Sequence, residues 1–335
     1  MKKFQIIMVF LCTVMLLVPC FIIPASALTI YDGNFGYELN VSTMEAKLID
    51  YNGTDTEITV PAYYRQFPVT SIDEYTFKGN TQITSITLPV TLKTVADESF
   101  MNCTALKSFT LPENVETIGR SVFRGCTSLE TVVFEPFLYD LPDYTFADCT
   151  ALKEVYLNFR FRNIGEGAFL NCSSLSEPNF FPNVFTVQAY SFAGTALESV
   201  VIPDTLTYLP DNSFTNCASL KEITIPKTVT FVEPNAFDKR DDMTIYCYYA
   251  TPGYDFAVLN GLHYVLLDEY TLGDCNDDGE VNVNDVTALQ RHICGLSPLN
   301  EVLLKAADVE GSGQVDVNDV TYLQRVLAEF DDATL

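Results

Sequence analysis

Oxygen-bearing side chains recur at every second position in residues 274–282, and residue 285 carries another. This spacing is that of a twelve-residue calcium-binding loop, in which the ligands stand at positions 1, 3, 5, 7, 9 and 12. Gly279 occupies the sixth position, where such a loop turns sharply. The candidate calcium ligands are Asp274, Asn276, Asp278, Glu280 through its backbone carbonyl, Asn282 and Asp285. An acidic turn without a metal is the alternative interpretation.

A second loop with the same spacing begins 34 residues later. Its candidate ligands are Asp308, Glu310, Ser312, Gln314 through its backbone carbonyl, Asp316 and Asp319. Residues 274–295 and 308–329 are identical at 11 of 22 positions, which indicates two copies of one unit. Ser312 stands where the first loop has Asp278, so the second loop loses one short carboxylate. The sequence therefore predicts two Ca²⁺ sites, of which the second is the weaker.

Each loop runs directly into a segment with helical spacing of apolar residues. The apolar residues are Val286, Leu289 and Ile293 after the first loop and Val320, Leu323 and Leu327 after the second. No amphipathic helix pattern precedes the first loop, because residues 264–273 are strand-like and then turn-like. The repeated unit is thus a loop followed by a helix, which is half of an EF-hand.

This duplicated half EF-hand, with Asp as the last ligand of each loop, resembles the type I dockerin of cellulosomal proteins. The resemblance covers about residues 272–330. It implies a small all-α module in which two calcium-loop helices are related by a pseudo-two-fold axis. It also implies a partner, which is a cohesin module on a scaffoldin.

In that family the cohesin is contacted by loop positions 10 and 11 and by a pair of residues on the following helix. The resemblance assigns these roles to Val283, Asn284, Gln290 and Arg291 in the first half and to Val317, Asn318, Gln324 and Arg325 in the second. Because both halves carry identical residues, the resemblance implies that either face can bind. Alternatively, Arg291 and Arg325 form ion pairs within the module instead of contacting a cohesin. The Val-Asn pair at loop positions 10 and 11 leaves the class of cohesin open.

A phenylalanine recurs at an almost constant interval through the middle of the chain. The register is marked by Phe77, Phe100, Phe123, Phe146, Phe169, Phe192, Phe214 and Phe237. All successive intervals are 23 residues except the one of 22 that follows Phe192. An aliphatic residue precedes each Phe by five positions, Cys often follows by three, and a short alternating strand comes next. One such unit cannot bury its own apolar side, but stacked units can.

The spacing Phe-x-x-Cys-x-x-Leu-x-x-Ile-x-Ile-Pro resembles the BspA-like, treponemal-type leucine-rich repeat family. The fold class that we expect is therefore an α/β repeat: a curved leucine-rich-repeat solenoid of about eight 23-residue coils, followed by the small all-α dockerin. Pro178 at a strand position and the short sixth unit predict a local irregularity near the fifth and sixth coils.

Composition shifts divide the chain into segments. Lys2 and Lys3, the apolar run 4–23 and Ala25-Ser26-Ala27 are typical of a secretory signal peptide, with a retained membrane anchor as the alternative. The predicted organisation is a signal peptide at 1–27, an N-terminal cap at 28–68, repeats at 69–242, a C-terminal cap at 243–267, a linker at 268–273 and the dockerin at 274–335. The mature protein is expected to be secreted, extracellular, attached to a cell-surface cellulosome and without a membrane contact.

The charge and the rare residue types exclude several functions. The net charge of −25 disfavours nucleic acid and anionic lipid surfaces as partners, because the overall field repels phosphate. Only two histidines are present, which argues against His-based catalysis. Two glutamates on the outward strand face, Glu154 and Glu222, are three repeats apart, too far for joint acid–base work across about 14 Å. We therefore expect no enzymatic activity.

Five cysteines follow the repeat register: Cys103, Cys126, Cys149, Cys172 and Cys217. Equivalent side chains on neighbouring coils are parallel and about 4.8 Å apart, whereas a disulfide needs Cβ atoms near about 3.8 Å that face each other. The pattern therefore predicts small buried thiols and not disulfides.

Three functions fit this organisation. The favoured one is a non-catalytic cellulosome component whose dockerin binds a scaffoldin while the repeats bind a protein or glycan. The alternatives are a free secreted leucine-rich-repeat adhesin and a polysaccharide-degrading enzyme or inhibitor of unrecognised type. Extra aromatic residues in the middle coils either form an exposed binding patch or pack between coils; they are Phe137, Tyr139, Phe159, Phe180, Phe181 and Phe185.

Overall fold

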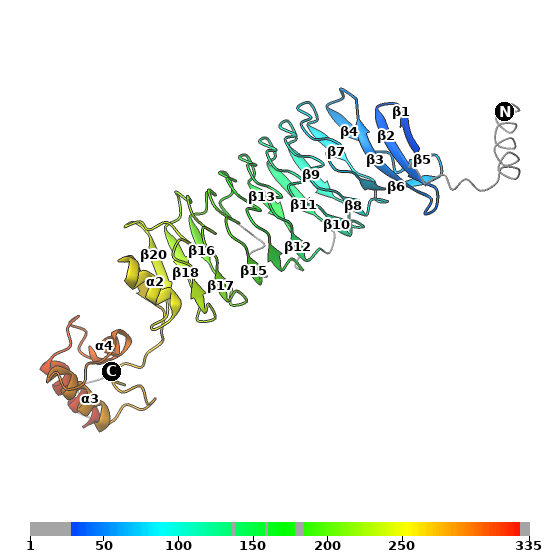
Figure 1. The fold of residues 1–335 in the computed structure, drawn as a ribbon. Helices are drawn as coiled ribbons and strands as arrows, with labels where there is room; N and C mark the ends of the chain where they lie inside the picture. Colours follow the sequence, from blue (N-terminus) through cyan, green and yellow to red (C-terminus); the bar gives the residue numbers. More distant parts are fainter. Residues whose placement is uncertain (1–27, 136–137, 158–159, 178–183, 329–335) are drawn as a thin grey trace, which may run out of the picture.

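The computed structural model describes residues 28–135, 138–157, 160–177 and 184–328. Within them the chain forms a β-solenoid of about nine turns of ~23 residues, followed by a helical region (Figure 1). The expected fold class is therefore confirmed, although the solenoid turns themselves consist of strands and tight turns. The predicted signal peptide and the residues Phe137, Phe159, Pro178, Phe180 and Phe181 lie outside the described residues.

An antiparallel meander covers the N-terminal end of the solenoid. It consists of β1 (Leu28–Asp32), β2 (Phe35–Asn40) and β3 (Glu45–Tyr51). Strand β3 then pairs in parallel with β6 (Phe67–Ile72), and β5 (Tyr63–Tyr64) folds back on β6 in antiparallel fashion. The meander thus converts hairpin pairing into the parallel pairing of the coils and covers the open end of the stack.

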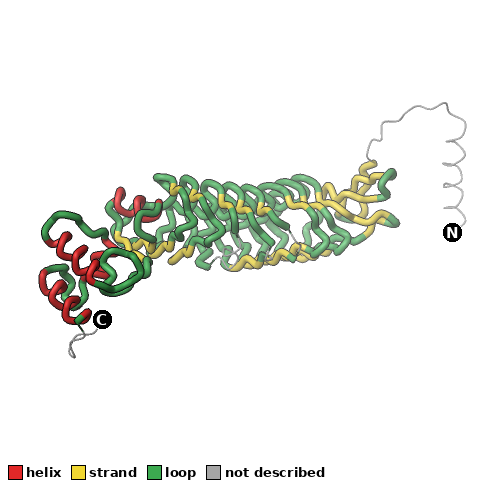
Figure 2. Tube along the Cα trace, turned by 90° about the horizontal axis from the view of Figure 1, so that it is seen from below, coloured by secondary structure: helices red, strands yellow, loops and turns green. Residues whose placement is uncertain are grey.

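Two rows of short parallel strands run along opposite sides of the solenoid (Figure 2). The first row contains β4 (Glu57–Thr59), β7 (Ser85–Thr87), β9 (Ser108–Leu111), β11 (Thr131–Phe134), β13 (Glu154–Tyr156), β16 (Ser199–Val201), β18 (Glu222–Thr224), β20 (Thr244–Cys247) and β21 (His263–Leu266). The second contains, after β6, β8 (Thr94–Val95), β10 (Thr117–Ile118), β12 (Asp140–Leu141), β14 (Asn163–Ile164), β15 (Thr186–Val187), β17 (Tyr208–Leu209) and β19 (Phe231–Val232).

The phenylalanine register forms one continuous column in the core. Each ring lies nearly parallel to the next, with centroids 4.9–5.7 Å apart from Phe77 to Phe237. All eight side chains are buried. The one-residue deletion after Phe192 leaves this column intact, since Phe192 and Phe214 are still 5.4 Å apart.

The strand rows are less continuous than this column. In the second row, β12, β14 and β15 form one sheet, while β17 and β19 form another. This break spans the position of the one-residue deletion. The second row is also interrupted between β10 and β12, and the first row between β7 and β9, so the core column continues where the strand ladders do not.

The cysteine column is buried and unpaired, and it makes a hydrogen bond that the sequence does not predict. Each thiol donates to the backbone carbonyl of the register Phe one coil earlier, at sulfur–oxygen distances of 3.0–3.2 Å. Cysteine therefore combines the volume of a small apolar side chain with a weak donor for an inward-facing carbonyl. The five register cysteines are free, as predicted, and so are the other three cysteines in the described residues, Cys247, Cys275 and Cys294.

The C-terminal cap contains a helix that the sequence analysis missed, α2 (Pro252–Asn260). Its ends carry ordinary signals: Thr251 at the N-cap, Pro252 in the first turn, and Gly261 in the left-handed conformation at the C-cap. Phe256 of α2 contacts Phe237 edge-on with centroids 5.8 Å apart, so the helix covers the last ring of the column.

Three helices form the C-terminal module: α3 (Val283–Ile293), α4 (Glu301–Ala307) and α5 (Val317–Leu327). Their core is separate from the solenoid core and includes Val286, Leu289, Val320 and Leu323. Ile293 and Leu327, predicted on the same apolar faces, are exposed, because each lies at the last position of its helix. Within the described residues, no helix is long and apolar enough to span a membrane.

Burial predicts how the thiols react. It raises the pKa of Cys126, Cys172 and Cys217, and that of Cys247 to about 12, so these thiols stay protonated and shielded at pH 8. Cys294 is the exposed thiol among the described residues. We expect iodoacetamide to add one label per folded mature chain and eight after denaturation, as measured by mass spectrometry. The Cys294→Ser variant should take up none when folded; rapid labelling of the repeat cysteines would contradict the buried column.

Candidate calcium-binding and docking site

The first carboxylate of each predicted loop organises the turn that follows it. Asp274 accepts hydrogen bonds from the backbone N–H groups of Asp278 at 3.2 Å and Gly279 at 2.9 Å. Asp308 accepts the equivalent bonds from Ser312 at 2.9 Å and Gly313 at 2.8 Å. The two loops therefore share these turn-forming hydrogen bonds despite their differences in sequence.

Glycine is required at the sixth position of both loops. Gly279 and Gly313 both have φ of 84°, a conformation that other residues rarely adopt. The positive φ lets the chain fold back, so that its oxygen atoms face the loop interior.

The last carboxylate of each loop is fully buried and closes the loop onto its helix. Asp285 accepts from the backbone N–H groups of Cys275 at 2.8 Å and Asn282 at 2.8 Å. Asp319 accepts from those of Glu310 at 3.3 Å and Asp316 at 2.8 Å. These contacts complete a capping box at the start of α3 and of α5.

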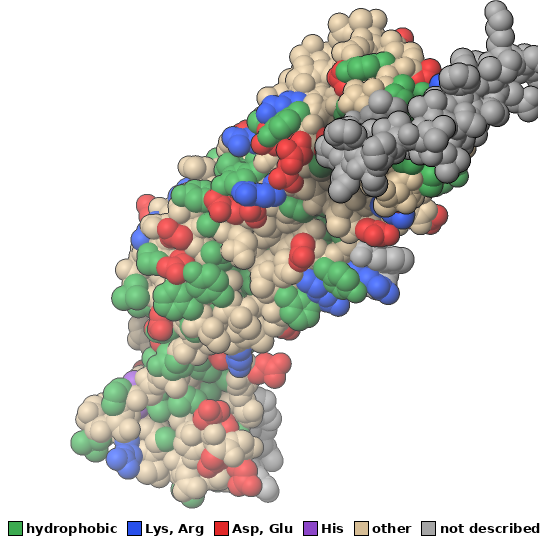
Figure 3. Space-filling view, turned by 45° about the vertical axis from the view of Figure 1, so that its right-hand side comes forward, with side chains coloured by type: hydrophobic (Ala, Val, Ile, Leu, Met, Phe, Trp, Pro, Cys, Tyr) green, Lys and Arg blue, Asp and Glu red, His purple; other side chains and the backbone are tan. Residues whose placement is uncertain are grey.

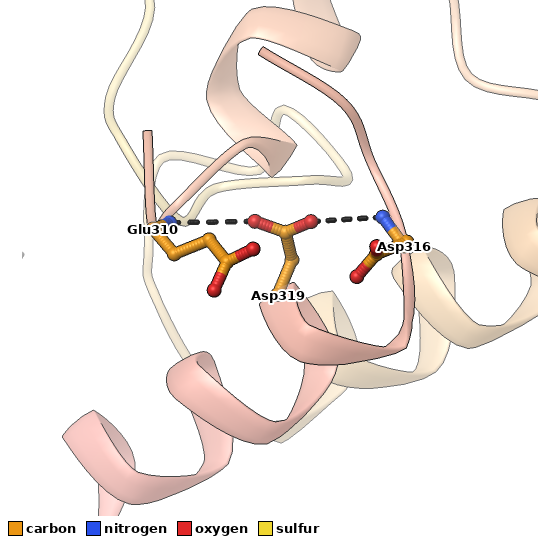
Figure 4. A group of neighbouring side chains, drawn as sticks. All are labelled: Glu310, Asp316 and Asp319. Carbon is orange, nitrogen blue, oxygen red and sulfur yellow. Dashed lines mark hydrogen bonds between the residues drawn. The ribbon is translucent and has the colours of Figure 1, made fainter. Parts of the chain in front are cut away.

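The second loop gathers three carboxylates at one point. Oxygen atoms of Glu310, Asp316 and Asp319 lie within 4.8 Å of one another. Figure 4 shows Asp319 between the other two, with its oxygens held by their backbone N–H groups. In the first loop the places of Glu310 and Asp316 are taken by Asn276 and Asn282, which offer amide oxygens.

Such a donor set fits calcium. Several hard oxygen atoms converge, and three crowded carboxylates repel one another unless a cation neutralises them. In the second loop the Ser312 hydroxyl donates to the carbonyl of Gln314 at 3.0 Å, so the ligand at position 5 is neutral and engaged with the ligand at position 7. The first loop has Asp278 at this place, whose carboxylate accepts from the backbone N–H of Glu280 at 3.0 Å.

Cys275 lies near carboxylates of both loops. Burial raises the pKa of this thiol to about 12, and the negative charges of Asp285, Asp274 and Asp319 add to the shift. Asp319 belongs to the second loop, so both loops face the same small core.

The predicted partner-binding residues lie on the surface at the starts and outer faces of α3 and α5. Val283 and Val317, the first residues of the two helices, are 69% and 64% exposed. Asn284, Gln290, Asn318 and Gln324 are also exposed, and Arg325 is half-buried. Arg291 is exposed and makes no ion pair within the described part of the chain, which disfavours the intramolecular pairing proposed for it.

The solenoid surface carries several exposed aromatic rings on the second strand row. Of the middle-coil aromatics singled out from the sequence, Tyr139 and Phe185 are described and both are exposed. Tyr208 and Phe231 are exposed as well, and their rings stack at 6.2 Å. In Figure 3, hydrophobic side chains are interspersed with charged groups along the visible face of the solenoid.

Two family models match the chain. The model of the BspA type leucine rich repeat region matches residues 70–196 and 185–247 in six copies. The model of the dockerin type I domain matches residues 272–328. No curated protein matches the chain. The matched domain types are non-catalytic, and no enzyme domain is seen.

Solved structures of bacterial leucine-rich repeat proteins also match. A leucine-rich cell surface protein from Faecalibacterium prausnitzii is 21% identical over 73% of this chain and 96% of its own, with a TM-score of 0.36. A leucine-rich repeat protein from Bacteroides ovatus is 18% identical over 66% of this chain and 79% of its own, with a TM-score of 0.38. The leucine rich repeat protein of T. pallidum is 16% identical over 72% of this chain and 100% of its own, with a TM-score of 0.36.

The repeat model covers more than half of the chain, and the paired calcium-type loops lie within the second match. The chain belongs to the BspA-type leucine-rich repeat proteins and carries a type I dockerin domain in its C-terminal region.

Proposed function

We propose that this protein is a secreted, non-catalytic component of a cellulosome. Its dockerin binds a cohesin on a scaffoldin in the presence of calcium, and its repeats bind a protein or glycan. The observation that carries this proposal is the identical, exposed Val-Asn pair at the start of α3 and of α5, each following a loop with calcium-type spacing of oxygen side chains. The proposed boundaries are those of the sequence analysis, with the signal peptide removed at residue 27.

Calcium binding is testable loop by loop. Asp274→Ala and Asp308→Ala each remove a carboxylate ligand that also accepts two backbone N–H groups. We expect each variant of the mature chain to lose one of two calcium sites, with affinity there falling about 100-fold or more. Because the first loop is proposed to be the tighter, Asp274→Ala should remove the stronger site in a calorimetric titration.

The matched control is Asp277→Asn, an exposed residue of the first loop at position 4, where Asn tolerates its φ of 61°. This variant should bind two calcium ions as the parent does. If Asp274→Ala loses the weaker site, the second loop is the one with the higher calcium affinity. If the parent chain binds no calcium, the metal assignment is refuted.

Cohesin binding should survive damage to either face but not to both. Val283→Glu and Val317→Glu place a carboxylate at an exposed first helical position, where it favours the helix, so folding is preserved. Each single variant should bind cohesin as the parent does, and the double variant should lose binding. Calorimetry against a panel of cohesins, with Ca²⁺ and with EDTA, measures this.

The control for the cohesin experiment is Val201→Glu, an equally exposed valine on the solenoid strand β16. It should leave cohesin binding unchanged. Absence of binding to every cohesin, despite calcium-induced folding, would refute the docking role and favour the free adhesin. Loss of binding in one single variant would restrict docking to that face.

The ligand of the repeats should contact the exposed aromatic residues of the second strand row. We expect Tyr208→Ala with Phe231→Ala to reduce binding at least about tenfold, since aromatic residues that become buried at an interface commonly contribute about 2 kcal/mol or more. Binding is measured on arrays of cell-wall glycans and of bacterial and host surface proteins. Tyr156→Ala, an exposed tyrosine on the opposite row, is the control; a larger effect there would assign the ligand to the other row.

A further inference from the structure

Helix α4 contacts the solenoid cap with its first residue. The phenol of Tyr254 on α2 donates to one carboxylate oxygen of Glu301 at 2.9 Å, and that of Tyr264 on β21 donates to the other at 2.6 Å. Hydrogen bonds from hydroxyl groups to a carboxylate are among the stronger ones in proteins. The two rings also meet edge-on with centroids 5.4 Å apart, so the cap presents a preformed pair of donors.

The neighbouring residues extend this contact. Val302 is partly buried and packs against the solenoid core, although it belongs to the C-terminal module. A notch of about 380 Å³ lies at the junction and is lined by Tyr264, Val265 and Leu266 from the cap and by Glu301, Leu304 and Lys305 from α4. The bond to Glu301 raises the pKa of Tyr254 and of Tyr264, which keeps both donors protonated at neutral pH.

The other end of α4 contacts both calcium loops. Asp308 is the C-cap residue of α4 and also the first ligand of the second loop. The carbonyl of Ala306 accepts a hydrogen bond from the backbone N–H of Gly273 at 2.8 Å, and Gly273 directly precedes Asp274 of the first loop. Ala306 and Ala307 are buried. One seven-residue helix therefore joins the cap to the starts of both loops.

We propose that the solenoid cap is a docking surface for the dockerin's own helix α4, and that calcium binding and this docking strengthen each other. Calcium binding restrains Asp308 and the backbone before Asp274, and both restrain the position of α4. Docking holds α4 from its other end through Glu301. Because the two events favour the same position of one helix, each raises the affinity of the other by the same factor.

This docking leaves the proposed cohesin faces accessible. Val283 and Val317 are exposed, and neither the tyrosine pair nor the notch at the junction involves α3 or α5. The segment 268–273, proposed as a linker, is therefore tied at its end to α4. The dockerin is held in a set orientation on the solenoid when calcium is bound.

The test removes the two donors and keeps their rings. The variant Tyr254→Phe/Tyr264→Phe of the mature chain is compared with Tyr31→Phe/Tyr144→Phe, which removes two other tyrosine–carboxylate hydrogen bonds, to Asp50 and Glu166, far along the chain from the cap. In a calorimetric calcium titration we expect the first variant to bind at least one calcium ion about fivefold or more weakly and the second to match the parent.

Hydrogen exchange supplies an independent measurement. In the parent chain, EDTA should increase amide exchange in residues 252–267, which contain α2 and β21; in Tyr254→Phe/Tyr264→Phe, exchange there should be raised in calcium as well. In a Glu301→Gln variant the acceptor loses its charge. Its exchange rate in residues 252–267 in calcium should lie between that of the parent and that of Tyr254→Phe/Tyr264→Phe.

Either of two results would overturn the proposal: unchanged exchange of residues 252–267 on calcium removal, or parental calcium affinities in the tyrosine variant. Neither experiment uses a cohesin. If the protein binds no cohesin, these measurements still test the contact between α4 and the cap.

Discussion

The stacking of each coil on the next at a single buried phenylalanine is the constraint on which the solenoid depends. The rings repeat at 4.9–5.7 Å, close to the spacing between hydrogen-bonded strands, so the core column and the strand ladders reinforce each other. The ring column is the more continuous of the two: it runs unbroken across the coil that loses one residue, whereas the strand rows are interrupted there between β15 and β17 and also between β7 and β9 and between β10 and β12. A column of this kind has two open ends, and the meander β1–β3 and the helix α2 exist to cover them.

The sequence predicts the parts of the molecule that repeat. Two positions after each register Phe, the chain adopts a left-handed conformation, and only Gly, Asn or Asp stands there from Gly79 to Asn216. The loop ligands are predictable for the same reason, since each loop copies the other. What occurs once was missed: α2 spans nine residues and has no second copy, although Pro252 and Gly261 mark its ends. The contact of Tyr254 and Tyr264 with Glu301 was missed because it joins residues 47 and 37 positions apart, with no pattern to connect them.

In the C-terminal module, the predicted ligand residues also build the backbone of the site. Asp274, Asp285, Asp308 and Asp319 each accept backbone N–H groups, so the same carboxylates define the turn, cap the following helix and face the loop interior. Loop closure and helix start are thus one structural unit. A change in the loop therefore acts on the first turn of α3 or α5, where Val283 and Val317 lie. This is the physical link between the proposed calcium dependence and the proposed cohesin face.

The two halves of the dockerin are equivalent in their outward residues but not in their attachment to the rest of the chain. Within the described residues, the second loop directly follows a helix, α4, whereas the first does not, and α4 is the helix bonded to the solenoid cap. The solenoid therefore breaks the pseudo-two-fold symmetry of the module that it carries. If either face can engage the same cohesin, the bound dockerin differs between the two modes by a half-turn about its pseudo-two-fold axis. With α4 docked on the cap as proposed, that half-turn carries the whole repeat array with it. Dual binding in this protein then has a consequence that a flexible linker would remove: the repeats and their exposed aromatic row can point in two discrete directions from one scaffold position.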